Sequence, residues 1–386
     1  MQVVVTGLIG AYPLGGVAWD YLQFVKGFVA LGCRVTYLED TGQWAYNPRL
    51  GTFTEEAADN LRHLRDVLSR VPGMADSFAY RDPRGTLHGL SEQEIAARCR
   101  SAELFLNVSD SAWLRDGYRG ARVLACYDSD PLYTQAAWLA AETGDRSQQS
   151  RPGAYRSYDA YFTMGENMND ASCRVPRCGV EWKTTRQPIT LEDWPARFDP
   201  AARSFTTVMS WKTKPALPVL GGRVYGAKDV EFRRFAALPG RVRPPLEIAV
   251  SGPAPREEMA AHGWHVVDAA ERSTTMERYR DYIAASRAEW SVAKEAYVAT
   301  ASGWFSCRSA CYLAMGKPVV VQDTGFSRLY PTGEGLFAFR GIEDAAAAIE
   351  AVDADYRRHC HAARAIAESY FRAEIVLEKL LHDAGL

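Results

Sequence analysis

A single stretch carries the clearest structural signal in this chain. It runs from Ser302 to Gly325 and reads SGWFSCRSACYLAMGKPVVVQDTG. A glycine-containing turn comes first, followed by a helix, a Gly-Lys-Pro stop and an apolar strand. The first turn of a helix has unpaired N–H groups and a partial positive charge, so a helix that follows such a turn can hold a phosphate. The stretch therefore predicts an anion-binding helix N-terminus inside an α/β domain.

Length and charge limit the kind of protein this can be. The chain has 386 residues and a net charge of −2, from 45 Lys plus Arg and 47 Asp plus Glu. A single core seldom grows to this size, so we expect two domains. Because the near-neutral charge gives no overall field to attract a polyanion, we expect no nucleic-acid partner.

The sequence also predicts no transmembrane segment. No apolar run approaches the roughly 18 residues of a membrane helix. The apolar residues near Met1 form a predicted buried strand rather than a signal peptide, because no basic region precedes them and glycines interrupt them. We therefore expect a cytoplasmic protein.

The eight cysteines are too sparse for a disulfide framework in a chain of this length. Two pairs lie close in sequence, Cys173 with Cys178 and Cys307 with Cys311. Neither pair has a second pair at the spacing of a zinc site. We expect reduced cysteines, most of them buried, and no metal.

The first half of the chain alternates short apolar strands with helices. A strand over 3–5, a glycine-rich loop over 6–16, a helix over 17–31 and a strand over 34–38 form one βαβ unit, the opening of a doubly wound parallel sheet. In such sheets, ligands bind beyond the carboxyl ends of the strands, so the loops that follow the strands should share one rim. Further strands are predicted at 104–108, 122–127 and 160–164.

A second series of strands and helices follows a junction at 185–204. Its strands are predicted at 206–210, 246–251, 264–267, 289–293 and 319–322, and the chain is helical from 342 onward. We therefore divide the chain into an N-terminal domain (1–200), a C-terminal domain (201–352) and terminal helices (353–386) that pack back on the N-terminal domain.

Two successive Rossmann-like series with terminal helices resemble the GT-B class of glycosyltransferases. Gly303 to Ser306 matches the turn and hydroxyl of that family's donor motif, and Gly316-Lys317-Pro318 matches the start of its closing strand. The resemblance implies two Rossmann-like domains facing across a cleft, the C-terminal one for a UDP- or dTDP-linked sugar and the N-terminal one for the acceptor. It also implies metal-independent transfer of a hexosyl or deoxysugar to a hydroxyl of a small molecule or glycan, with no cofactor.

The chain departs from the family in two places. The position that often holds Glu is here Ser309 or Cys311, depending on the register, which leaves Glu295 as an alternative partner for the ribose. The first loop, residues 7–16, contains no histidine, so the histidine base of many inverting members is excluded there.

The candidate diphosphate ligands are the amides near 305–307, the Ser306 hydroxyl, and Arg308 or Lys294, because a leaving diphosphate needs donors and cations. The alternatives are a helix cap for Ser306 and solvated surface positions for the two cations. For Ser251-Gly252 the alternative is a plain turn. The full candidate donor-binding set is Ser251, Gly252, Lys294, Glu295, Gly303, Ser306, Arg308, Ser309, Gln322, Asp323 and Thr324.

A general base must deprotonate the acceptor hydroxyl, and acidic residues near the expected rim are the candidates. They are Asp128, Asp130, Asp20 and Glu166. For the Asp-Ser-Asp pair the alternative is a turn cap before a proline. The acceptor-side loop is expected to contribute Gly10, Tyr12, Gly15 and Gly16. Aromatic residues in this half, Trp44 and Trp113 among them, would suit a planar or sugar-like acceptor, although core packing explains most of them equally well.

Two other functions stay open. A dinucleotide-dependent oxidoreductase would account for the glycine loop and for the acidic pair Glu39-Asp40, although Gly7-x-x-Gly10 does not fit the G-x-G-x-x-G pattern. A catalytically silent glycosyltransferase-like binding protein would account for the absent Glu.

Overall fold

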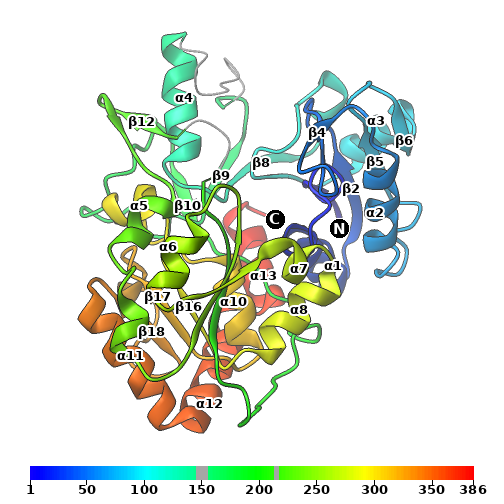
Figure 1. Ribbon diagram of the computed structural model, residues 1–386. Helices are drawn as coiled ribbons and strands as arrows, with labels where there is room; N and C mark the ends of the chain where they lie inside the picture. The colour runs from blue at the N-terminus through cyan, green and yellow to red at the C-terminus, as the bar shows by residue number, and fades with distance from the viewer. Residues whose placement is uncertain (145–154, 213–216) are drawn as a thin grey trace.

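Two parallel sheets, one in each half of the chain, organise the structure (Figure 1). The computed structural model describes residues 1–144, 155–212 and 217–386. Helices cover the faces of both sheets, which is why the central strands can be apolar on both faces. All five residues of β1 (Gln2–Thr6) are buried, for example. The prediction of two doubly wound α/β domains is confirmed.

The first sheet has the strand order β10-β9-β8-β7-β1-β2-β5-β6. Its pairs are parallel except β5 with β6, which forms an antiparallel edge. After β1, its strands are β2 (Arg34–Glu39), β5 (Phe78–Arg81), β6 (Leu87–Gly89), β7 (Leu104–Val108), β8 (Val123–Asp128), β9 (Ala160–Thr163) and β10 (Trp182–Thr184). A small hairpin of β3 (Ala45–Asn47) and β4 (Thr52–Thr54) lies outside the sheet. Strands β5, β6 and β10 and this hairpin were not predicted from the sequence.

The helices of this half follow local sequence signals. Gly32, with φ +75°, supplies the positive φ that ends the first helix. Ser91 and Glu94 form a capping box at the start of α3. The helices are α1 (Gly15–Ala30), α2 (Ala58–Leu68), α3 (Glu92–Ser101) and α4 (Tyr133–Thr143).

The second sheet is parallel throughout, in the order β15-β14-β11-β16-β17-β18. Its strands are β11 (Phe205–Ser210), β14 (Leu246–Ser251), β15 (His265–Asp268), β16 (Ala288–Ser291), β17 (Val319–Gln322) and β18 (Leu336–Phe339). A short hairpin joins β12 (Val219–Leu220) to β13 (Arg223–Val224). The helices are α5 (Lys228–Arg233), α6 (Arg256–Ala261), α7 (Ala269–Ser273), α8 (Met276–Ala285), α9 (Glu295–Ala299), α10 (Cys307–Ala314) and α11 (Ile342–Ala354).

The terminal helices divide between the two halves. Helix α12 (Tyr356–Ile366) packs on α10, and after a π-helical turn α13 (Ala373–Asp383) packs on α1. A Cβ on Gly27 of α1 would lie 2.5 Å from a methyl of Leu377, so glycine allows this close approach. The chain passes between the domains twice, and the two connecting segments lie side by side where Ile189 pairs with Arg372.

No helix within the described residues is both long enough and apolar enough to cross a lipid bilayer.

Candidate functional site

Helix α10 begins where the sequence predicts an anion site. Ser306 occupies its N-cap position, but no side chain caps the first turn. Ser309, also in that turn, is fully buried, and its hydroxyl has no hydrogen-bond partner among the described residues. The capping alternative for the Ser306 hydroxyl is therefore not realised, and neither serine hydroxyl caps the helix.

A small cavity opens at this turn. Its lining comes from the ends of β16 and β17 and from α10 with the loop before it, and consists of Ser291, Val292, Ala293, Trp304, Phe305, Ser306, Arg308, Ser309, Val321, Gln322, Thr324 and Phe326. Gly303 lies beside it, since its N–H donates to the Thr324 carbonyl at 2.9 Å. The two ends of the 302–325 stretch thus meet around one cavity.

Three cations converge on this region. Arg308 makes an ion pair with the buried Glu289, with Nε 2.6 Å from Oε1, and Lys294 donates to Asp130 at 2.7 Å. Their side chains are 11% and 17% exposed, so neither occupies a solvated surface position. Lys228 at the start of α5 has no counter-ion among the described residues. Burial, together with the charges of Arg308 and Lys294, holds the pKa of Lys228 well below its usual range.

Lys228 was not among the residues predicted from the sequence. It begins a helix of only six residues, and the acidic Asp229 and Glu231 beside it give the segment the pattern of an ordinary charged surface turn. Lys228 makes no ion pair within the described residues, and the nearby Glu289 charge only partly offsets Arg308 and Lys294. A bound polyanion would stabilise an ammonium in this position. The three cations and the α10 N-terminus together form the candidate anion site.

Two predicted donor residues at the end of β17 are engaged inside their own domain. The Asp323 carboxylate accepts the Gly325 N–H and the Ser327 hydroxyl, both at 2.8 Å, and pairs with Arg340. This is the turn-capping alternative for Asp323. The amide of Gln322 is likewise hydrogen-bonded within the domain. Sugar contacts by these residues remain a prediction.

The other donor candidates lie at neighbouring strand ends. Glu295 accepts the Gly226 N–H at 2.6 Å and pairs with Arg223 at 2.7 Å, so it holds the β12–β13 hairpin. Ser251 donates its hydroxyl to a serine at the end of β11. Gly252 follows with φ +82°, as a turn after a strand requires. A role of Glu295 toward a ribose also stays a prediction.

Asp20 is the acidic candidate that faces the anion site from the first domain. It lies on α1, partly buried, and its carboxylate makes no hydrogen bond or ion pair within the described residues. Burial raises the pKa of Asp20 to about 7; Arg308 opposes this shift and Asp130 adds to it. Burial raises the pKa of Cys307, in the first turn of α10, and the Asp20 charge adds to this shift. A carboxyl with this pKa can take up or release a proton near neutral pH.

The other acidic candidates have partners. Asp128 accepts hydrogen bonds from Thr134, Gln135 and Thr163, at 2.7, 2.9 and 2.8 Å, and so fixes the start of α4 against β9. Asp130 binds Lys294 of the second domain.

Glu166 accepts hydrogen bonds from Arg186 and from the Tyr330 hydroxyl. Burial nevertheless raises its pKa.

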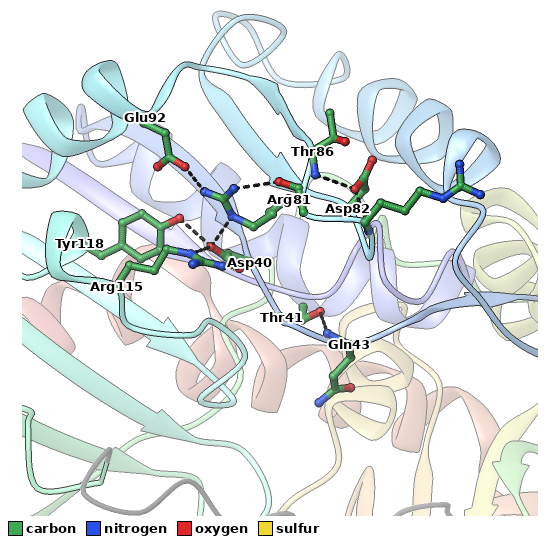
Figure 2. A network of polar contacts seen from close by, with 11 residues as sticks. Asp40, Thr41, Gln43, Arg81, Asp82, Thr86, Glu92, Arg115 and Tyr118 are labelled. Carbon is green, nitrogen blue, oxygen red and sulfur yellow. Dashed lines mark hydrogen bonds and ion pairs between the residues drawn. The ribbon is translucent and has the colours of Figure 1, made fainter.

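The loop after β1 is held by the acidic pair at the end of β2. Glu39 accepts the N–H groups of Gly10 and Ala11. Asp40, fully buried, accepts from Arg81, Arg115 and Tyr118, as Figure 2 shows. Both carboxylates are therefore used within the domain. The oxidoreductase interpretation loses the acidic residue that would bind a ribose.

The predicted acceptor-side loop is shorter than expected. Gly15 and Gly16 belong to the first turn of α1, where Gly15 passes close to the Thr275 carbonyl and Gly16 to the Tyr279 ring of the second domain. Gly10 and Tyr12 stay in the loop, and the Tyr12 ring contacts aromatic rings of the β3–β4 hairpin. The two glycines thus allow the domains to approach.

Comparison with known proteins identifies the fold. No protein-family model and no curated protein sequence matches this chain. Among solved structures, AviGT4, a glycosyltransferase involved in avilamycin A biosynthesis, matches with 13% identity and a TM-score of 0.51 over 100% of this chain and 97% of its own. An alpha-glucosyltransferase in complex with UDP matches with 9% identity and a TM-score of 0.57 over the whole of both chains. The chain has the GT-B fold.

A third GT-B structure, Anabaena Alr3699/HepE in complex with UDP-glucose, has 11% identity and a TM-score of 0.57 over 99% of this chain and 98% of its own. All three matches span both domains. The candidate anion site lies at the carboxyl ends of the second GT-B sheet, and Asp20 reaches it from the first.

Proposed function

We propose that this GT-B protein is a glycosyltransferase that moves a sugar from a nucleoside diphosphate to an acceptor hydroxyl. One observation carries the proposal: the uncapped first turn of α10 contains Arg308 and lies near Lys228 and Lys294, and Lys228 has no counter-ion among the described residues. Breaking the bond between sugar and phosphate leaves negative charge on the diphosphate, which fixed N–H groups and cations stabilise. The GT-B structures that contain UDP and UDP-glucose support a uridine nucleotide, with a dTDP-linked sugar as the alternative.

The proposed binding mode divides the work among these groups. The N–H groups of the α10 first turn and the hydroxyls of Ser306 and Ser309 bind diphosphate oxygens, and Lys228 and Lys294 neutralise their charge. Arg308 is already paired with Glu289, so we assign it no direct bond to the diphosphate. Its positive charge lies beside the N-terminus of α10. With this charge supplied by side chains, we propose that the reaction needs no divalent cation.

Asp20 is the proposed general base. As the acceptor oxygen forms its bond to the anomeric carbon, the bond from that carbon to the diphosphate breaks and the hydroxyl proton passes to the Asp20 carboxylate. A pKa of about 7 suits a base that works near neutral pH. Asp128 and Glu166 are weaker candidates because neighbouring donors already occupy their oxygens.

The acceptor is proposed to be a small molecule or glycan bound on the first domain. Trp44 and Trp113 are 55% and 48% exposed in loops that follow β2 and β7, and exposed indole rings stack well on sugars and planar molecules. Another solved structure, with a TM-score of 0.55, is an alpha-glucosyltransferase that contains UDP-glucose and DNA. The net charge of −2 gives no support for a DNA acceptor here.

Two experiments on the full chain test the proposal. The first is calorimetric titration with UDP, dTDP and NAD. The second is an assay for nucleotide released from UDP-glucose and dTDP-glucose in the presence of a panel of sugar acceptors. Binding of UDP or dTDP with acceptor-dependent release supports transfer. Binding without release under all conditions indicates the silent binding protein, for which the replacement of the family's Glu by Ser309 or Cys311 is the argument. Binding of NAD alone overturns the proposal.

A further inference from the structure

Asn167 joins the first domain to two turns of the second. It lies in the loop after β9, and its backbone N–H donates to the Ser302 carbonyl at 3.0 Å. Its side-chain amide donates to the carbonyls of Ala301 and Gly325, both at 3.1 Å. Asn167 is only 4% exposed, so these bonds are largely shielded from water.

Two glycines make room for this amide. Gly303 and Gly325 have φ of +76° and +97°. A Cβ on Gly303 would lie 2.7 Å from the Asn167 nitrogen, and a Cβ on Gly325 would lie 2.5 Å from its Nδ2. Side chains at either position would displace Asn167, so both turns are shaped for an asparagine from the other domain.

The same two turns form one side of the α10 cavity. Gly303 donates its N–H to Thr324 at 2.9 Å, and the Thr324 hydroxyl donates to the Trp304 carbonyl at 2.6 Å. Trp304 and Thr324 both line the cavity. A residue that holds the 301–303 turn and the turn at Gly325 in place therefore also holds the cavity wall in place.

We infer that Asn167 is a positioning residue that makes the donor site depend on domain closure. With the domains closed, its amide holds both turns in the geometry that binds the diphosphate; with the domains apart, the turns lose these bonds and donor affinity falls. Donor binding in turn favours the closed state, because coupling between binding and conformation is reciprocal. This inference rests on the proposed function, since it assigns the cavity to the nucleotide donor.

The variant Asn167→Asp tests it, because a carboxylate cannot donate to the two carbonyls. Asn169→Asp is the matched control: Asn169 lies in the same loop and donates to Trp182 at 3.0 Å, within the first domain. We expect Asn167→Asp to weaken UDP binding, measured by calorimetry, about tenfold or more, because both side-chain hydrogen bonds to the second domain are lost. Small-angle scattering should show a larger radius of gyration for the free variant, with UDP restoring the wild-type value.

The outcomes are separable. If the wild type binds neither UDP nor dTDP, the proposed function fails, and this inference fails with it. If the wild type binds and Asn167→Asp binds equally well with the same radius, only this inference fails. Should Asn167→Asp not fold, Asn167→Ala, which adds no charge, replaces it, and unchanged affinity then overturns the inference. A similar loss of affinity in Asn169→Asp would also overturn it, because the effect would then belong to the loop as a whole.

Discussion

Lys294 of the second domain donates to Asp130 of the first, with Nζ 2.7 Å from Oδ1. Tyr297, one turn further along α9, donates its hydroxyl to the same carboxylate. The Lys294 ammonium also lies over the Tyr133 ring, 4.4 Å from its centroid. One lysine is therefore both part of the candidate anion site and part of the contact between the domains.

This pair predicts a measurable coupling. In a double-mutant cycle of Asp130→Asn and Lys294→Gln, we expect a coupling of about 1 kcal/mol in the free energy of urea unfolding, because the Asp130 side chain is 44% exposed and solvent screens the pair. High salt should reduce this coupling. Strictly additive effects of the two substitutions would contradict the contact.

Lys228 gives a prediction in which affinity and stability move in opposite directions. Its charged form is disfavoured by burial and by Arg308 and Lys294, so Lys228→Gln should leave the melting temperature unchanged or raise it. UDP binding should weaken by about tenfold to a hundredfold, the loss expected for a hydrogen bond to a charged group. Calorimetry and thermal unfolding measure the two effects. Lys379→Gln, at an exposed position on α13, is the control and should change neither.

Asp20 links activity to pH-dependent stability. Burial raises its pKa to about 7 in the folded protein, against an ordinary value of 3.8, so between these values the folded state holds a proton that the unfolded state has lost. The contribution of Asp20 to stability is therefore present at low pH and is lost as the pH rises through 7. Asp20→Asn should unfold at higher denaturant than the wild type at pH 8, and this advantage should vanish near pH 4.

The same variant tests the chemistry. Asp20→Asn should lose transfer activity by at least about a hundredfold, as expected when a general base is removed, while UDP affinity stays within a few fold. The activity of Asp128→Asn is measured beside it, since Asp128 is a weaker candidate for the base. A fully active Asp20→Asn enzyme would exclude Asp20 as the base.

The Asp40 network in Figure 2 predicts a purely structural effect. Asp40→Ala removes the carboxylate that accepts hydrogen bonds from Arg81 Nε and from the Tyr118 hydroxyl. We expect a loss of about 3–5 kcal/mol in the free energy of unfolding. In the folded fraction, nucleotide affinity should not change. A selective loss of nucleotide affinity would instead return Asp40 to the ligand-binding candidates.

Local patterns in the sequence predicted a large part of the fold. The βαβ opening and the 302–325 stretch were recognisable because a strand, a turn and a helix follow one another without a break. Strand β10 was not predicted: it has three residues, one of which is Lys183, and gains its stability from pairing with β9. Strands β5 and β6 were missed for the same reason as β10, since they are also short. Whether such a short segment forms a strand depends on its pairing with distant parts of the chain.

The candidate site divides in a similar way. Ser306, Ser309 and Arg308 lie together because one helix turn carries them all. Lys228 and Asn167 reach the site from elements far away in sequence, and a single sequence does not encode that approach as a local pattern. Their signals are physical ones, an ammonium among cations and an amide seated against two glycines, and these exist only in the folded chain.

The double crossing at Ile189 has a mechanical consequence. Ile189 donates its N–H to Phe371 at 2.7 Å and accepts the N–H of Ala373 at 2.9 Å, so the outgoing and returning segments are bonded side by side. Two backbone hydrogen bonds therefore tie the two connections between the domains to each other. A hinge of the kind that the Asn167 inference requires would have to move both connections together, because neither can change its backbone conformation without the other.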